Sequence, residues 1–332
     1  MLKLGIIGTN WITHQFVGAA IETQQFELHS IYSRSVESGL KFGETYQQTN
    51  VYTDLSAFFA DEALEVVYLA SPNSMHYEQA KQALLAGKHV ISEKPAVSRL
   101  VELEELHQLA DTQGVFYFEA ARNIHEENFK QVAEMIPALG PIVTANFSYM
   151  KYSSRYDQVV AGEEPNIFSP KFSGGALMDL GIYLVYSAVA WFGKPEEVHY
   201  FARKLPTGVD GVGHMIFRYQ DFDVNMMTGK SSTSFLPSEI IGHTQTISMN
   251  ATNSIEEISL YDHTTGEMTA IPVVKEDNPM VEEARTFAQL INRDDLQDAT
   301  YRELLDVMHT VHEVMEDLRL QEGITFAADI KE

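Results

Sequence analysis

Short apolar runs alternate with amphipathic helical stretches through the first third of the chain, and this alternation constrains the fold more than any other feature. Repeated β-α-β units at this spacing are typical of parallel strands joined by right-handed helical crossovers. The sequence therefore predicts a doubly wound parallel sheet, of Rossmann type, over residues 1–121. The expected strands are Leu2–Ile7, Glu27–Tyr32, Leu64–Ala70, His89–Ile91 and Val115–Glu119, and the expected helices are Trp11–Thr23, Val36–Tyr46, Ser74–Ala86 and Leu100–Thr112.

The pattern changes near Ala120. After an apolar helix over 174–192, strand-like segments follow one another with short polar turns and no intervening helices, which indicates a mainly antiparallel sheet. We expect a second, α+β domain over 122–332 with an open sheet and two closing helices, Pro279–Asn292 and Ala299–Leu320. Pro237 predicts that its segment is an edge strand or a loop, because proline cannot donate to a ladder.

Composition excludes several classes of function. The chain has 332 residues, a formal net charge of −24 and no cysteine. The acidity and the lack of a basic stripe argue against nucleic acid as a partner, and the missing thiols exclude disulfides and cysteine-ligated metals. The first residues do not resemble a signal peptide, and Asp179 leaves the apolar stretch that follows it too short to cross a bilayer. We expect a cytoplasmic enzyme of small molecules, with no membrane partner.

A glycine turn follows the first expected strand and begins the first expected helix, which is where a dinucleotide fingerprint belongs. It reads Gly8-Thr9-Asn10-Trp11-Ile12-Thr13, so Asn10 and Thr13 stand where the usual pattern has glycine or alanine. Because asparagine tolerates the left-handed region, a tight turn at Asn10 remains compatible with the motif. By itself the motif fits a structural turn as well as a cofactor site.

The end of the second expected strand bears on which cofactor is used. Sites for NAD commonly carry an Asp or Glu at this point for the ribose 2′-hydroxyl, whereas this chain has Ser33 and Arg34. A hydroxyl and a guanidinium suit a 2′-phosphate through charge-assisted hydrogen bonds. We expect NADP to be preferred, with NAD as the alternative; a solvated arginine is the competing explanation of Arg34.

Four motifs, taken together, resemble the Gfo/Idh/MocA oxidoreductases. They occur in the family's order and in both halves of the chain. The resemblance implies a Rossmann domain, a C-terminal α+β domain, hydride transfer between NAD(P) and a carbon bearing oxygen on a sugar, cyclitol or related compound, and a homodimer or higher homo-oligomer. The motifs are the turn from Gly8 to Ile12, Ser71-Pro72-Asn73 with His76, Glu93-Lys94-Pro95, and the run Gly174 to Tyr183 with Asp179.

Lys94, Asp179 and Tyr183 are the candidate catalytic residues. Pro95 keeps Lys94 out of the helical region just beyond a strand end, where ligands bind in open α/β sheets. Asp179 and Tyr183 are four residues apart, so a regular helix places them on one face. We expect Lys94 and Tyr183 to transfer the proton that accompanies hydride transfer and Asp179 to orient the substrate oxygen. A dipole-stabilised acid and a core tyrosine are the alternatives.

The remaining candidates belong to the binding sites. The expected cofactor contacts add Thr9, Trp11, Ser71, Pro72, Asn73, His76 and Glu93, and the expected substrate contacts are Arg122, Arg155 and Tyr183. His309 and His312 lie one helical turn apart, but without a third ligand they predict an exposed helix face and no metal site. Two other functions remain open on this fold: a dinucleotide-sensing regulatory protein, and redox-neutral glycoside cleavage with retained NAD.

Overall fold

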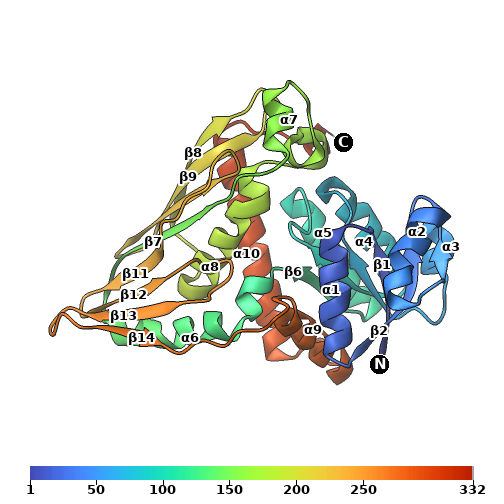
Figure 1. Cartoon of the computed structure of the whole chain (residues 1–332), viewed down its shortest axis with the longest axis horizontal. Coiled ribbons are helices and arrows are strands. Elements are labelled where there is room, and N and C mark those ends of the chain that lie inside the picture. The colour runs from blue at the N-terminus through green and yellow to red at the C-terminus, as the bar shows by residue number, and fades with distance from the viewer. Residues whose placement is uncertain (331–332) are drawn as a thin grey trace. The chain divides into compact units, whose positions relative to one another are not determined.

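In the computed structural model, which describes residues 1–330, the chain forms two compact units (Figure 1). The first comprises Met1–Ala120 and Glu276–Asp306, and the second comprises Ala121–Lys275 and the residues from 307 onward. The expected division placed everything after residue 121 in one domain. The structure instead returns residues 276–306 to the first unit, because a helix in this segment packs against the first sheet.

The first unit is built on a six-stranded parallel sheet, as the alternation predicts. Its strand order is β3-β2-β1-β4-β5-β6, so the direction of strand addition reverses between β1 and β4. The very short β3 was not expected from the sequence. The strands are β1 (Leu2–Ile7), β2 (Phe26–Tyr32), β3 (Val51–Tyr52), β4 (Val66–Leu69), β5 (His89–Glu93) and β6 (Tyr117–Ala120).

The four expected helices of this unit are present in the predicted order. The structure adds the short α3, which the sequence did not predict, and α9 from the end of the chain. Alternate residues of the central strands, such as Ile6 and Tyr68, pack in one buried cluster with Phe16 of α1 and Phe287 of α9. Phe287 stacks on Phe118 of β6 with ring centroids 4.7 Å apart, which fixes α9 to this sheet. The helices are α1 (Trp11–Glu22), α2 (Val36–Gly43), α3 (Leu55–Phe59), α4 (His76–Leu85), α5 (Leu100–Gln113) and α9 (Val281–Arg293).

An eight-stranded sheet forms the second unit, in the order β14-β13-β12-β11-β7-β10-β9-β8. Only the pair β7 and β10 is parallel, and the other pairs are antiparallel, which confirms the expected mainly antiparallel sheet. The strands are β7 (Ile142–Met150), β8 (Glu197–Lys204), β9 (Asp210–Arg218), β10 (Asp223–Gly229), β11 (Ser238–Gly242), β12 (Gln245–Met249), β13 (Ile258–Asp262) and β14 (Met268–Ile271).

The prediction for the Pro237 segment was wrong. β11 is an interior strand between β12 and β7. It begins at Ser238, the residue after Pro237, so the position without an N–H lies just outside the ladder. A proline immediately before a strand therefore limits where pairing starts and does not restrict the strand to an edge.

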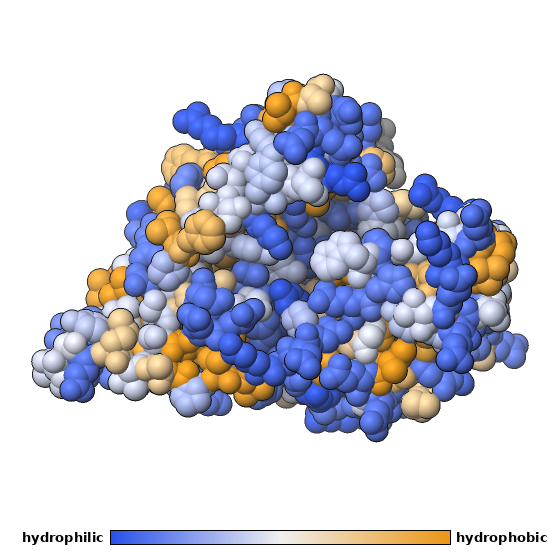
Figure 2. Space-filling view, in the orientation of Figure 1, coloured by the Kyte–Doolittle hydropathy of each residue, from blue (hydrophilic) through white to orange (hydrophobic). Residues whose placement is uncertain are grey.

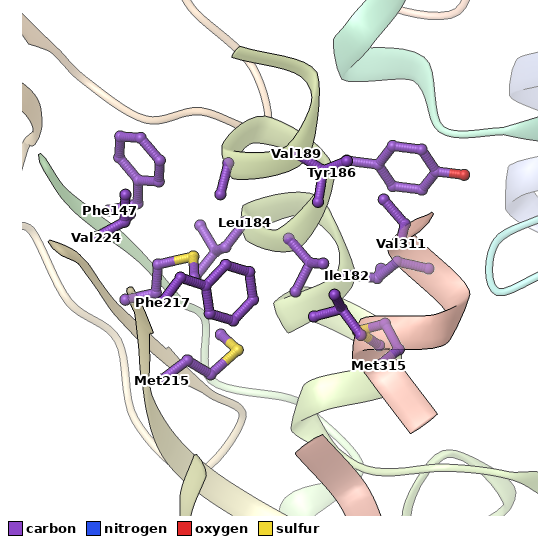
Figure 3. Packing of buried hydrophobic residues seen from close by; sticks show 14 of the residues in the cluster. Phe147, Ile182, Leu184, Tyr186, Val189, Met215, Phe217, Val224, Val311 and Met315 are labelled. Carbon is purple, nitrogen blue, oxygen red and sulfur yellow. The ribbon is translucent and has the colours of Figure 1, made fainter. Parts of the chain in front are cut away.

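The apolar stretch from Pro170 to Phe192 is a core element. By length and composition it is sufficient to cross a membrane, but 72% of its most apolar window is buried inside the protein. Its main helix, α8 (Ile182–Phe192), packs between the sheet and α10 (Ala299–Gln321). Figure 3 shows Phe217 of β9 and Met315 of α10 among the side chains around α8. The two other helices of this unit are α6 (Glu127–Met135) and α7 (Tyr156–Val160).

Most of the face shown in Figure 2 is hydrophilic, with apolar residues scattered over it. This agrees with the large negative charge of the chain and with the ordinary surface of a globular protein.

Candidate active site

The glycine turn after β1 is set by Gly8. Its φ of +105° lies in a region that favours glycine, and a Cβ at this position would lie 2.6 Å from the carbonyl oxygen of Ala70. Asn10 does not use the left-handed conformation that asparagine tolerates: its backbone is extended, and its side chain accepts hydrogen bonds from the N–H groups of Ile12 and Thr13. Its amide also donates to the Ala70 carbonyl, at 3.0 Å. Asn10 therefore caps α1 and joins the ends of β1 and β4.

This turn lies where the strand order reverses. In open α/β sheets, ligands bind at such switch points beyond the carboxyl ends of the strands. The backbones of Gly8 and Ala70 approach each other closely at this point. Trp11, at the start of α1, is 73% exposed. The residues present fit a dinucleotide: Gly8 gives close backbone approach, and Thr9 to Ile12 form the rest of the turn.

In the loop after β2, the side chain of Ser33 is buried in the protein and that of Arg34 is exposed to solvent. Ser33 is buried and its N–H donates to the Tyr52 carbonyl of β3. Arg34 is exposed. Ser35 caps α2 by accepting from the N–H of Ser38, at 3.2 Å. The guanidinium of Arg34 therefore stands in solvent beside the start of a helix, while the backbone that carries it is tied to the sheet.

Lys94 follows the last residue of β5 and is half-buried. The strand end before it is held by Tyr68 of β4, whose hydroxyl donates to Glu93 Oε1 at 2.5 Å. The loop after it is held by Glu119 of β6, which accepts from the Ala96 N–H at 2.6 Å. The Lys94–Pro95 peptide bond is cis. Neighbouring strands thus fix the backbone on both sides of Lys94.

His76 connects the loops after β4 and β5. Its side chain is 1% exposed, and its ring nitrogens lie 2.9 Å from the Pro95 carbonyl oxygen and 2.8 Å from that of Ser71. Burial lowers the pKa of His76, and the two carbonyl contacts oppose that effect. The imidazole therefore links the loop that carries Lys94 to the loop after β4. Nearby, Pro72 precedes the short helical turn that begins at Asn73.

In the second unit, Asp179 lies in a π-helical turn, η7 (Leu177–Gly181), that leads into α8. Such turns are rare and occur often at functional sites. Asp179 forms an ion pair with Lys230, the residue after β10, and the ammonium lies 5.6 Å from the centre of the Phe168 ring. Nothing in the local sequence of Asp179 indicated this partner, which is 51 residues away.

Tyr183 is the second residue of α8, directly after the π turn. Its ring meets that of Tyr149 on β7 edge-on, with centroids 5.9 Å apart. Its carbonyl accepts from the Ser187 hydroxyl at 2.9 Å and from the buried Asn123 amide at 3.3 Å. Because the π turn intervenes, Asp179 and Tyr183 do not share a regular α-helical spacing.

The two expected substrate arginines lie in different settings. Arg122 begins the turn after β6, and its guanidinium is 3.7 Å from the buried Glu126 carboxylate. Arg155 precedes α7 and is exposed, with its N–H donating to the Ser153 hydroxyl. Both belong to the second unit.

A buried carboxylate explains Gly175, the second glycine of the pair before η7. Asp210 of β9 is 1% exposed and accepts from the Leu177 N–H at 2.6 Å and from the Tyr200 hydroxyl at 2.7 Å. Gly175 has a φ of +121°, and a Cβ there would lie 2.2 Å from Asp210 Oδ1. Gly175 thus allows the Asp210 side chain of β9 to cap the turn that carries Asp179. Within residues 1–330, no cluster of three or more His, Asp or Glu side chains is arranged to hold a metal ion.

Comparison with known proteins places these features in a family. The profile described as "Oxidoreductase family, NAD-binding Rossmann fold" matches residues 2–121, and the GFO/IDH/MocA C-terminal domain matches residues 129–248. The chain belongs to the Gfo/Idh/MocA oxidoreductases. It is therefore an NAD(P)-dependent oxidoreductase, and its first unit is the Rossmann domain that the β-α-β alternation predicts.

Among curated members of the Gfo/Idh/MocA family, two align over 99% of both chains. One is scyllo-inositol 2-dehydrogenase (NADP(+)) IolU of Bacillus subtilis, at 36% identity, and the other is the uncharacterized oxidoreductase YgjR of Escherichia coli, at 35%. The fold also matches that of KijD10, a 3-ketoreductase from Actinomadura kijaniata solved with NADP and TDP-benzene. That match has a TM-score of 0.83 and 21% identity, and it covers 96% of this chain and 97% of the other.

Proposed function

We propose that this protein transfers hydride between NADP and a carbonyl or hydroxyl carbon of a small polyhydroxy compound, with cyclitols first among its substrates. The observation that carries this proposal is the 36% identity to the NADP-dependent scyllo-inositol 2-dehydrogenase over 99% of both chains. Sugars and dicarbonyl compounds are the next candidates. A homodimer or higher homo-oligomer in the cytoplasm is the assembly we expect.

Within this proposal, Lys94 and Tyr183 handle the proton and Asp179 orients the oxygen that gains or loses it. The bound nicotinamide supplies or accepts the hydride. Oxidation of an alcohol requires a base for the hydroxyl proton, and reduction requires an acid for the same oxygen. The fixed loop around Lys94 supports its role, because a proton-transfer group must be held close to the reacting atom. The ion pair and the π turn of Asp179 support an orienting role.

NADP preference follows, in this proposal, from Ser33 and Arg34. Arg34 is exposed beside the start of α2, and Ser33 replaces the acid that would repel a 2′-phosphate. The rest of the cofactor would lie along the turn from Gly8 to Ile12, with Ser71, Pro72 and Asn73 beyond β4 and Glu93 and Lys94 beyond β5. His76 would contribute by bracing these loops.

Two measurements on the purified protein test the proposal. Fluorescence titration should show tighter binding of NADPH than of NADH, and incubation with NADP⁺ and scyllo-inositol should produce NADPH. Tighter NADH binding would contradict the assignment of Ser33 and Arg34. Cofactor binding without turnover of any cyclitol, sugar or dicarbonyl compound would refute the enzymatic proposal and favour a dinucleotide sensor.

A further inference from the structure

Lys230 is an enclosed cation in the second unit. It follows the last residue of β10, and its side chain is 4% exposed. Its backbone is held on both sides, because its N–H donates to the Gly211 carbonyl at 2.8 Å and its carbonyl accepts from the Ser153 N–H at 2.9 Å. A lysine is rarely so enclosed unless it is paired. The backbone of Lys230 is therefore fixed at the end of the interior strand β10.

The ion pair between Lys230 and Asp179 is asymmetric. The Lys230 side chain is almost fully buried, whereas that of Asp179 is 25% exposed. The ring of Phe168 lies 5.6 Å from the ammonium and covers it further. Of the two side chains, that of Lys230 is therefore enclosed by the protein, and that of Asp179 is accessible to solvent.

We infer that Lys230 is a positioning residue that fixes the rotamer in which the Asp179 carboxylate meets the substrate. This inference rests on the proposed role of Asp179. A carboxylate in a π turn lacks the support of a regular helical repeat, so a partner on a separate, rigid element determines where its oxygens lie. Removing one partner of such a pair leaves the other charge poorly compensated.

The direct test compares K230M, K230R, D179N and the double variant K230M/D179N in steady-state turnover of scyllo-inositol with NADP⁺. A misplacement of about 1 Å can cost about 100-fold in rate, so we expect K230M to lower kcat roughly 10- to 100-fold, with the NADPH dissociation constant unchanged. K230R, which retains the charge, should restore part of this loss. In the D179N background, K230M should have little further effect, because Lys230 acts through Asp179.

Lys194 provides the matched control. It forms an ion pair with Glu313 at 2.6 Å in the same unit, but both side chains are substantially exposed. Surface pairs of this kind contribute little, so K194M should keep the wild-type kcat and unfolding temperature. This control separates loss of a particular cation from loss of any cation in an acidic protein.

Three results would overturn the inference. The first is a folded K230M variant with the kcat of the wild type. The second is a K230M/D179N variant whose fold-loss in kcat equals the product of the fold-losses of K230M and D179N, because that would mean that the two residues act independently. The third result is independent of turnover: carbon-13 NMR of the aspartate carboxyl groups, with D179N assigning the signal, should show that signal displaced in K230M. An undisplaced signal would mean that the pair does not form. If the wild type turns over no polyol, the proposed function fails, and this NMR result alone decides whether Lys230 controls Asp179.

Discussion

Replacing Asp210 with alanine should destabilise the second unit severely, even though the residue lies outside the proposed chemistry. The carboxylate accepts from the Leu177 N–H at 2.6 Å and from the Tyr200 hydroxyl at 2.7 Å, and it is 1% exposed. Hydrogen bonds to a charged group contribute about 1.5–3 kcal/mol each, and their buried donors would lose their acceptor. We therefore expect the free energy of unfolding to fall by about 3–6 kcal/mol. Y200F should cost about 1–3 kcal/mol, because only the bond from the Tyr200 hydroxyl is lost.

Tryptophan fluorescence offers an assay specific to this unit. The chain has two tryptophans. Trp11 is in the first unit, whereas Trp191 is in the second, with its ring centroid 4.4 Å from that of Phe129. In a W11F background, urea unfolding followed by Trp191 emission reports on the second unit. A D210A variant that unfolds at the same urea concentration as its parent would refute the reasoning.

The pH dependence of this effect has a definite sign. Burial raises the pKa of Asp210 above its ordinary value of 3.8, while the bonds from Tyr200 and Leu177 oppose the shift. The folded state therefore holds the proton more tightly than the unfolded state. The stabilisation that protonation provides is complete below pH 3.8 and is lost as the pH rises through the folded-state pKa. Relative to D210N, the wild type should lose stability over that window, and the opposite slope would contradict the account.

Three further predictions concern the first unit. G8A should destabilise it by about 1–3 kcal/mol and weaken NADPH binding, because the new Cβ meets the Ala70 carbonyl; denaturation and fluorescence titration measure the two effects. E119Q should lower kcat without abolishing cofactor binding, because it weakens by about 1–2 kcal/mol the bond that holds Ala96 in the loop of the proposed catalytic lysine; steady-state kinetics checks this. R34A should raise the dissociation constant of NADPH by roughly 10- to 100-fold and leave that of NADH nearly unchanged, and equal effects on both would remove Arg34 from the 2′-phosphate site.

Much of the fold could be predicted because strands and helices leave patterns of apolar residues over short stretches of the sequence. The alternation of strands and helices predicts the parallel sheet. The helical periodicity predicts Leu100–Thr112 and Ala299–Leu320, and the observed helices α5 and α10 each end one residue later, at Gln113 and Gln321. The interior position of β11 could not be predicted from Pro237, because a proline one residue before a strand removes no hydrogen bond from the ladder. The return of α9 to the first unit was missed because its partner, Phe118, is far away in sequence.

The site was only partly visible from the sequence, for the same physical reason. Lys94 and Asp179 stand in motifs that can be recognised along the chain. Their contacts are not visible in the same way: Glu119 of β6 bonds to the loop of Lys94, and Lys230, the residue after β10, pairs with Asp179. No short sequence pattern connects these residues with the motifs. Asn10 shows the limit of a propensity argument: it is extended and caps α1, whereas Gly8 carries the positive φ.

The most direct test of the central claim is the turnover of scyllo-inositol with NADP⁺ by the wild type and by K94A, measured by NADPH formation. General acid–base catalysis contributes about 100- to 10,000-fold. The account predicts clear turnover by the wild type and a loss of that order in a folded K94A. A K94A variant with near wild-type kcat would show that the proton passes through another group, and a wild type that reduces no NADP⁺ with any polyol would contradict the proposed function.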